Sequence, residues 1–396
     1  MRKNLLLLTL STIFALLLLE GAIGLGTNIG LFRIRVPTYS IDKAHSRQFW
    51  RDMNTDFGVW HPSNLVYRHT RSCFDVPYRS NSHGARDPER ALQSQRPRVV
   101  VLGDSFIEGW GVTDADRLTN VLERDTGIEH LNFATAANFG VTQYYLLYKA
   151  LASRFTHTAV IIGMLPANDF WDDDYAFGQQ AHSNRYRPYL IGEYPNYRLV
   201  YHQATLEQSA FRDRAGWLGF AQRLLAEFTY SYNAFAYFKL LLATQGDPAA
   251  AGTRAPPETG ALGAPLPLDR SRPYSGFYDY RQDQLDRAKY AFGQIKKLAA
   301  GRSVVIVLLP TLADFKRYDP SKPPTLSVEL DKFATANGMQ LVDLLPSMHA
   351  HTKNWDSYIL PCDGHWNAEG HAVAARYLKE KLTPLLGDLL VPRPAR

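Results

Sequence analysis

From position 98 onward, short apolar runs alternate with stretches in which apolar residues recur at helical spacing. The apolar runs predict strands at 99–102, 130–133, 159–165, 303–309 and 339–342. The stretches between them predict helices near 116–124, 143–153, 280–299 and 327–337, and a closing helix at 368–382. Buried β-branched strands that alternate with amphipathic helices are typical of a parallel sheet covered on both faces. The pattern therefore predicts an α/β fold.

Two segments interrupt this alternation and indicate how the chain is divided. Residues 28–95 carry few apolar runs and several turn signals, so we expect an irregular extension packed on the main domain. Residues 172–275 are rich in aromatic side chains, contain one predicted helix at 216–242, and are interpreted as an insertion. The predicted organisation is a leader at 1–27, the N-terminal extension at 28–95, a main domain at 96–385 that contains the insertion, and a tail at 386–396.

The leader is strongly apolar. Arg2 and Lys3 precede residues 5–19, which would span roughly 22 Å as a helix, against about 30 Å for the hydrocarbon core of a bilayer. Extending the run to Leu25 closes the gap and places Glu20 near the outer interface. The leader is either an uncleaved signal anchor or a signal peptide cut after the small residues near Ala22. We expect a single-pass protein of the cell membrane with its main domain on the periplasmic or extracellular side, and a secreted protein as the alternative.

Composition narrows the classes of protein that fit. With 396 residues, 45% of them hydrophobic, the chain can bury a sizeable core. Its formal net charge of +6 is spread without a long basic run, so nucleic-acid binding is not expected. Asp169, Asp172, Asp173 and Asp174 offer the carboxylate oxygens that calcium uses, but they lack the spacing of a binding loop. We expect a solvated turn there, and we predict no metal and no cofactor.

The chain has two cysteines, Cys73 and Cys362. In an exported protein an isolated pair of this kind is a candidate disulfide. Such a bridge would join the N-terminal extension to the residues just before Asp363. Two free buried thiols are the alternative.

The chemistry is concentrated in two short motifs. Gly103-Asp104-Ser105 follows the first predicted strand, which would present the Ser105 hydroxyl at the carboxyl end of the sheet, where open α/β folds bind their ligands. A serine nucleophile requires a base and an acid that orients the base. The motif Asp363-Gly364-His365-Trp366-Asn367 offers both, with His365 as base and Asp363 as its partner. Asn367 is expected to cap the helix that follows.

Acyl transfer also requires donors for the developing oxyanion. The first candidate is the backbone N–H of Ser105. The second is a backbone N–H in the turn 137–140, where either Asn138 or Gly140 could serve, and the third is the side-chain amide of Asn168. All three follow strand ends, so the predicted fold brings them to one edge of the sheet.

The chain resembles the SGNH, or GDSL-type, hydrolase superfamily. The first motif block of that family matches Gly103-Asp104-Ser105, the third matches Asn168-Asp169, and the last matches Asp363 with His365. The resemblance covers roughly residues 96–385, apart from the insertion. It implies a flavodoxin-like three-layer α/β/α fold, no metal, and ester hydrolysis or acyl transfer with Ser105 as nucleophile and His365 as base.

Two departures from the family pattern refine the resemblance. The usual Asp-x-x-His is Asp-x-His here, a variant similar to periplasmic alginate O-acetylation proteins, and Pro166 stands where a glycine is usual. The membrane leader, the stretch 78–84 and the motif at 363–367 together resemble proteins associated with bacterial cell-surface polysaccharides.

Three tryptophans lie close to these motifs. Trp110, Trp171 and Trp366 could stack on sugar rings or fill the core. His371 lies on the closing helix and is expected at the surface.

These features favour an exported serine esterase or O-acyltransferase that acts on ester-linked acyl groups, acetyl above all, of a carbohydrate. Hydrolysis and transfer share an acyl-enzyme, so the motifs do not separate them. The alternatives are a non-catalytic polysaccharide-binding or assembly protein, and a lipid esterase if the insertion forms an apolar lid.

Overall fold

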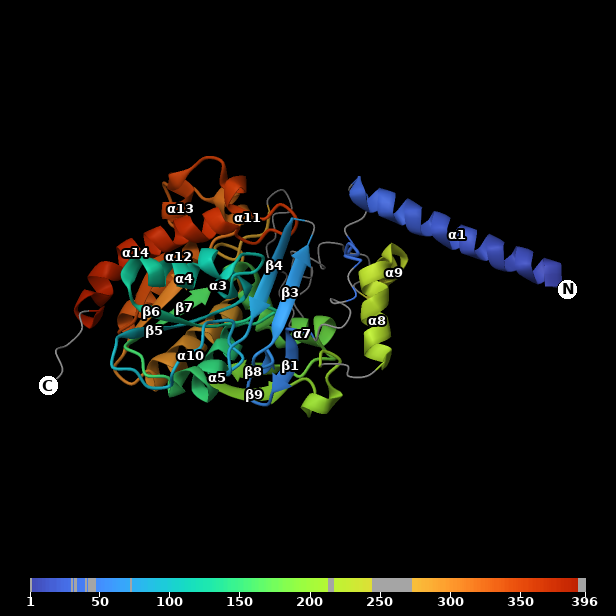
Figure 1. Cartoon of the computed structure of the whole chain (residues 1–396). Coiled ribbons are helices and arrows are strands. Elements are labelled where there is room, and N and C mark those ends of the chain that lie inside the picture. The colour runs from blue at the N-terminus through green and yellow to red at the C-terminus, as the bar shows by residue number, and fades with distance from the viewer. Residues whose placement is uncertain are drawn as a thin grey trace. The chain divides into compact units, whose positions relative to one another are not determined.

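The computed structural model describes residues 2–29, 31, 34–39, 41, 48–71, 73–212, 217–243 and 273–390 (Figure 1). The chain divides into two units. The first comprises Met1–Arg47, Thr70–Asp75 and Asp213–Arg254, and the second comprises Gln48–His69, Val76–Arg212 and Ala255–Arg396. Residues 244–272 of the predicted insertion and residues 391–396 of the predicted tail lie outside the described residues. The domain boundaries stay predictions.

The second unit is built on a parallel sheet. Its strands are β5 (Arg98–Gly103), β6 (Glu129–Ala134), β7 (Ala159–Met164), β10 (Ser303–Leu308) and β11 (Gln340–Asp343). Valine and isoleucine dominate β5, β7 and β10 because branched side chains pack well on a pleated surface, and β5 and β7 are buried along their whole length. The order across the sheet is β11-β10-β7-β5-β6, and every neighbouring pair is parallel. In chain order this is 2-1-3-4-5, the flavodoxin-like arrangement.

Helices cover both faces of the sheet. Figure 1 shows α4 (Leu118–Thr126) and α14 (Ala368–Leu390) on one side, and α5 (Val141–Ala150) and α10 (Gln282–Leu298) on the other. The remaining helices of this unit are α3 (Ser105–Glu108), α6 (Pro166–Asp172), α7 (Tyr175–Ala181), α11 (Leu312–Arg317), α12 (Thr325–Ala336) and α13 (Leu345–His351). The predicted three-layer α/β/α fold is confirmed. The closing helix runs past its predicted end, because it continues through Pro384.

The extension and the insertion are more regular than predicted. The pairs β1 (Arg51–Asn54) with β2 (Gly58–Trp60) and β3 (Val66–Arg71) with β4 (Phe74–Arg79) lie in the extension, and β8 (Pro188–Glu193) pairs with β9 (Asn196–Tyr201) in the insertion. The expectation of an irregular extension was wrong for these residues, since three to six residues of mixed polarity carry little periodic signal.

One buried carboxylate joins the extension to the insertion. Asp52 in β1 accepts hydrogen bonds from the Arg185 guanidinium at 2.7 Å, the Tyr186 amide at 2.8 Å and the Ser209 hydroxyl at 2.6 Å. The two segments are therefore held together by contacts between residues more than a hundred positions apart in the sequence, which local patterns cannot reveal.

The first unit contains α1 (Arg2–Asn28), α8 (Trp217–Phe228) and α9 (Tyr230–Ala243). Within the described part of the chain, α1 is the one helix long and apolar enough to span a membrane. The prediction of a single helix at 216–242 was wrong, because α8 ends at Phe228 and α9 begins at Tyr230. The carboxylate of Glu20 accepts the backbone N–H groups of Tyr230 and Ser231 and so starts a new helix.

Candidate active site

Ser105 stands where β5 ends and α3 begins. The Asp104 side chain accepts the Phe106 amide at 2.9 Å and caps this short helix. A Cβ atom on Gly103 would lie 2.4 Å from the side chain of Ile107, so the tight turn requires glycine. Ser105 is 9% exposed at the carboxyl edge of the sheet. The chain adds β6 on one side of β5 and then adds β7 on the other side. Such switch points in strand order are where open α/β sheets form crevices.

Ser105, His365 and Asp363 lie within hydrogen-bonding reach of one another. The Oγ atom of Ser105 is 2.8 Å from Nε2 of His365, and Nδ1 of His365 is 3.2 Å from Oδ1 of Asp363. With a proton on Nδ1 donated to the carboxylate, Nε2 is left as an acceptor that faces the serine hydroxyl. Burial alone would raise the pKa of Asp363, but hydrogen bonds from His365 and Trp110 hold it below its usual value. Asp363 is therefore ionised at neutral pH.

A local network fixes the loop that presents His365. The Leu360 amide donates to the His365 carbonyl at 2.7 Å, and Gly364 takes the left-handed conformation with φ of 85°. Asn367 accepts the Gly370 amide at 3.0 Å, which confirms the predicted cap of α14. The Asn367 side chain also donates to the Ser357 carbonyl at 2.7 Å. The loop is therefore braced on both sides of His365.

Trp110 contacts all three of Ser105, His365 and Asp363. Its indole N–H donates to Oδ2 of Asp363, its ring stacks on the imidazole of His365 with centroids 5.1 Å apart, and its amide donates to the Ser105 carbonyl at 2.9 Å. Phe106 packs against the same imidazole at 4.9 Å. The sequence drew attention to Trp110 by its nearness to Ser105, but its contact with Asp363 depends on the fold.

A residue of the extension supports the backbone that follows Ser105. Arg86 is fully buried and donates to three carbonyls just after Ser105, those of Glu108 at 3.0 Å, Gly109 at 2.5 Å and Val112 at 2.7 Å. Its guanidinium lies 3.4 Å from the ring centroid of Tyr78. Sequence reasoning missed this role, although Arg86 lies two residues after the stretch 78–84 that it had noted.

A second buried group ties α3 to the turn after β6. The carboxylate of Glu108 accepts the Trp50 indole N–H at 3.0 Å and the Ala136 amide at 2.5 Å, and it lies 3.4 Å from Nε2 of His61. The helix that carries Ser105 and the turn 137–140 are therefore held in a fixed relation.

The predicted oxyanion donors differ in how they are engaged. The Gly140 amide donates to the Gln143 side chain at 3.4 Å. The Asn168 amide nitrogen donates to Asp104 at 3.3 Å, which brings it beside the nucleophile turn. Ala137 and Asn138 adopt left-handed conformations with φ of 74° and 63°. Their carbonyls accept the guanidinium groups of Arg185, at 2.9 Å, and Arg187.

The aspartates near Asn168 are buried, so the predicted solvated turn is wrong. Ion pairs join Asp174 to Arg281 and Arg287, and Arg187 donates to the backbone carbonyl of Asp172. Burial raises the pKa of Asp104 and of Asp173 to about 6, and it holds the pKa of Asp169 well above its usual value. Ion pairs and hydrogen bonds with arginines distant in the sequence allow these aspartates to be buried. Among the described residues no group of three or more acidic, histidine or cysteine side chains is arranged to hold a metal ion.

Three residues singled out in the sequence, Trp366, Trp171 and His371, are buried. Trp366 is fully buried and donates to the Pro310 carbonyl at 3.0 Å, and Trp171 is 3% exposed, so both belong to the core and sugar stacking by them is excluded. His371 is also buried rather than at the surface, because α14 packs it beside Trp366. Burial and the nearby charges of Arg86 and Arg117 lower its pKa to about 3.

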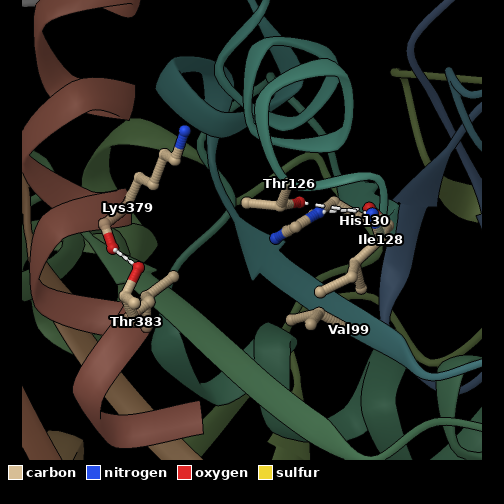
Figure 2. A pocket seen from close by; sticks show the side chains of 7 residues that line it. Val99, Thr126, Ile128, His130, Lys379 and Thr383 are labelled. Atoms are coloured by element: carbon tan, nitrogen blue, oxygen red, sulfur yellow. Dashed lines mark hydrogen bonds between the residues drawn. The ribbon is translucent and has the colours of Figure 1, made fainter. Parts of the chain in front are cut away.

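A small cavity lies at the opposite end of the sheet from Ser105. Its volume is about 10 Å³, room for about one water molecule. Figure 2 shows His130 bonded to the carbonyl of Ile128, with Lys379 and Thr383 of α14 across the opening. This cavity is too small for an acyl substrate.

Both Cys73 and Cys362 are disulfide-bonded, and the chain has no other cysteine. Cys362 directly precedes Asp363 in the sequence.

No family model matches the chain. No curated protein matches it in sequence. Several solved structures are similar in fold at low scores. A lipase/acylhydrolase from Enterococcus faecalis is 11% identical, covered over its whole length by 75% of this chain, with a TM-score of 0.34. A salicylyl acyltransferase from a tetracycline biosynthetic pathway is 12% identical, with 75% of this chain and 57% of that one covered and a TM-score of 0.35.

A family two carbohydrate esterase from Clostridium thermocellum, solved with cellohexaose, is 11% identical. The match covers 74% of this chain and 65% of that one, with a TM-score of 0.33. With scores this low, we draw the function from the geometry of the side chains.

Proposed function

We propose that the protein is an exported serine esterase or O-acyltransferase that acts on ester-linked acyl groups of a carbohydrate. The observation that carries the proposal is the hydrogen-bonded series Ser105, His365 and Asp363. A hydroxyl 2.8 Å from an imidazole nitrogen, whose other nitrogen faces an ionised carboxylate, has the geometry of an activated nucleophile.

In the first half-reaction Nε2 of His365 accepts the Ser105 proton while Oγ bonds to the ester carbonyl carbon. The tetrahedral intermediate collapses as His365 returns this proton to the leaving alcohol, which yields an acyl-enzyme. Water, or the hydroxyl of an acceptor, then attacks the acyl carbon with His365 again as base, and Ser105 is released with its proton restored. Asp363 stabilises the imidazolium at each stage.

The oxyanion would be bound by the Ser105 amide, the Asn168 side chain and the turn 137–140. Only one of the two Asn168 amide protons is engaged by Asp104, so the other remains for the substrate oxygen. In the turn, the Gly140 amide already has an acceptor. Arg185 donates to the carbonyl of Ala137. Because the peptide bond between Ala137 and Asn138 is trans, the N–H of Asn138 points away from Arg185. We therefore assign this donor to Asn138 rather than Gly140.

The site favours a short acyl group. Ser105 is 9% exposed, and Phe106 and Trp110 flank the base on two sides. An acetyl group needs little room beside such a serine. The assignment of a carbohydrate acceptor rests on the resemblance of the 363–367 motif and the leader to cell-surface polysaccharide proteins.

Retention of the leader as a membrane anchor is also part of the proposal. The helix α1 continues without interruption through Ala22 and Gly24, where a signal peptidase would cut, and Glu20 is used to start α9. The disulfide supports export, since such bonds persist in oxidising compartments. Peptide mapping without reduction should recover Cys73 linked to Cys362. Recovery of both as free thiols from the native host would contradict export.

Labelling with a fluorophosphonate probe tests the proposed function. Wild-type protein should be labelled covalently, Ser105→Ala should lose all labelling, and His365→Ala should lose most of it. Ser153→Ala, in the turn that follows α5, is the matched control and should label like wild type. An unlabelled wild type would favour the non-catalytic binding protein. Acetate release from acetylated glycans, compared with fatty-acid release from phospholipids, separates the carbohydrate substrate from the lipid one.

A further inference from the structure

The helix α8 is amphipathic, but its apolar face is exposed and a charged residue is buried. Its buried residues are Gly219, Ala226 and Glu227. Trp217, Leu218 and Leu225 are 76%, 63% and 46% exposed. At 3.6 residues per turn these three apolar side chains lie within about 100° of one another. A helix of a soluble domain turns such a face inward.

Polar contacts hold α8 in this orientation. Glu227 is 3% exposed, and its carboxylate accepts hydrogen bonds from Arg35 and Thr38. The backbone carbonyl of Glu227 accepts the Tyr39 amide at 2.8 Å. The segment 34–39, which follows α1 along the chain, thus covers the polar face of α8 and leaves the apolar face outward.

The helix α9 also has exposed apolar side chains. Phe235 and Phe238 are 66% and 49% exposed and lie three residues apart, on one face. Asn233 on another face is buried and donates to the Ala226 carbonyl of α8 at 2.9 Å. The two helices therefore form one element with aromatic and aliphatic side chains directed outward.

This element is joined to the leader near its outer end. Figure 1 shows α9 close to the C-terminal end of α1, where Glu20 accepts the first two amides of α9 and Tyr230 packs against Gly24. From Lys3 to Glu20 the helix rises roughly 25 Å, slightly less than a hydrocarbon core of about 30 Å. With α1 across the bilayer from Lys3, the first turn of α9 lies about 5 Å inside the outer edge of the hydrocarbon.

We propose that α8 and α9 form a membrane-interface element whose exposed apolar face, with Trp217, Leu218, Leu225, Phe235 and Phe238, lies in the outer leaflet of the bilayer that holds α1. This deepens the proposed anchoring and rests on it. Tryptophan, phenylalanine and leucine on one face are the side chains that interfacial helices insert into the boundary of headgroups and acyl chains. The element also gives Glu20 hydrogen-bond partners, without which a carboxylate at this depth would be costly.

Spin labels on the full-length protein test this element. Single cysteines are introduced as Leu218→Cys and Phe235→Cys, with Leu298→Cys, a 40% exposed position of α10, as the matched control. Cys73 and Cys362 are disulfide-bonded and do not take the label. The protein is reconstituted in vesicles of phosphatidylethanolamine and phosphatidylglycerol, and collisions with oxygen and with a nickel chelate are compared. Labels at 218 and 235 should favour oxygen severalfold more than the label at 298.

A label at Leu10→Cys separates the two proposals. If position 10 reports the bilayer interior but 218 and 235 are as accessible to nickel as 298, the interfacial element is refuted and the anchor stands. If position 10 is also aqueous, or the purified protein lacks its first residues, anchoring itself has failed. Protection of 218 and 235 from both reagents, with spin–spin broadening, would indicate a second copy of the chain and overturn the lipid assignment.

Discussion

Replacing Trp110 by phenylalanine should lower kcat about tenfold while leaving KM nearly unchanged. The variant keeps an aromatic ring against His365 but removes the indole N–H that donates to Oδ2 of Asp363. A hydrogen bond to a charged acceptor contributes about 1.5–3 kcal/mol, and the Asp363 side chain is 20% exposed, so water replaces part of the lost bond. A net loss of about 1.4 kcal/mol in the orientation of the base corresponds to about a tenfold change in rate.

The loss has an upper bound set by Asp363 itself. Removing the orienting carboxylate of a serine triad lowers kcat by about 10⁴-fold in well-studied enzymes. Trp110→Phe leaves both hydrogen bonds between Asp363 and His365 in place, so its effect must be far smaller. The pKa of Asp363 should rise towards its ordinary value in the variant. The stability that its ionised form contributes, lost as pH falls through the folded-state pKa, should then be lost at a higher pH.

The assay is steady-state release of p-nitrophenol from p-nitrophenyl acetate, together with urea unfolding of each variant. Trp355→Phe is the matched control, because its indole N–H donates at 3.2 Å to the His349 carbonyl, remote from the triad. It should keep the wild-type kcat. If Trp110→Phe also retained the wild-type kcat with unchanged stability, the indole bond would have no part in orienting the base, and the reasoning would be refuted.

Three further predictions concern the surroundings of Ser105. Asn168→Ala should reduce kcat by about 10²–10³-fold if its amide binds the oxyanion, and an effect confined to KM would contradict this role. Burial raises the pKa of Asp104 from 3.8 to about 6. Ionisation of Asp104 should therefore lower the free energy of unfolding, by up to about 3 kcal/mol, as pH rises from 4 to 7. Asp104→Asn should flatten this dependence in urea unfolding, while the exposed Asp331→Asn should not. Arg86→Met removes the hydrogen bonds that Arg86 donates to three carbonyls, and it should lower the free energy of unfolding by about 3–5 kcal/mol. The control Arg79→Ala changes an exposed side chain and should alter this free energy by less than about 0.5 kcal/mol. Both are measured by chemical denaturation.

The parts of the fold predicted correctly have strong local signals. The strands β5, β7 and β10 are apolar runs, and the cap on α14 follows from Asn367 alone. The two motifs at the ends of the main domain identified the residues that meet at 2.8 Å. These features depend on spacing within a few residues, or on the common edge to which parallel strands deliver their ends.

What the sequence did not reveal depends on contacts between distant residues. Two helices replace one at 216–242 because Glu20, some two hundred positions earlier, starts the second. The aspartates after Asn168 looked solvated because their arginine partners lie in the insertion and at or within the start of α10. His371 is buried because the fold covers that side of α14, and a lone histidine on a helix carries no sign of this.

The support that Arg86, Tyr78 and Trp50 give to α3 sets a limit on how this protein can be dissected. A shortened version cut at residue 96, where the homogeneous α/β pattern begins, would look complete by its strands and motifs. It would nevertheless lose the three hydrogen bonds that Arg86 donates to carbonyls after Ser105, and the indole of Trp50 that donates to Glu108. A piece that keeps these contacts to α3 must include Trp50, so this part of the extension belongs to the same structural unit as Ser105.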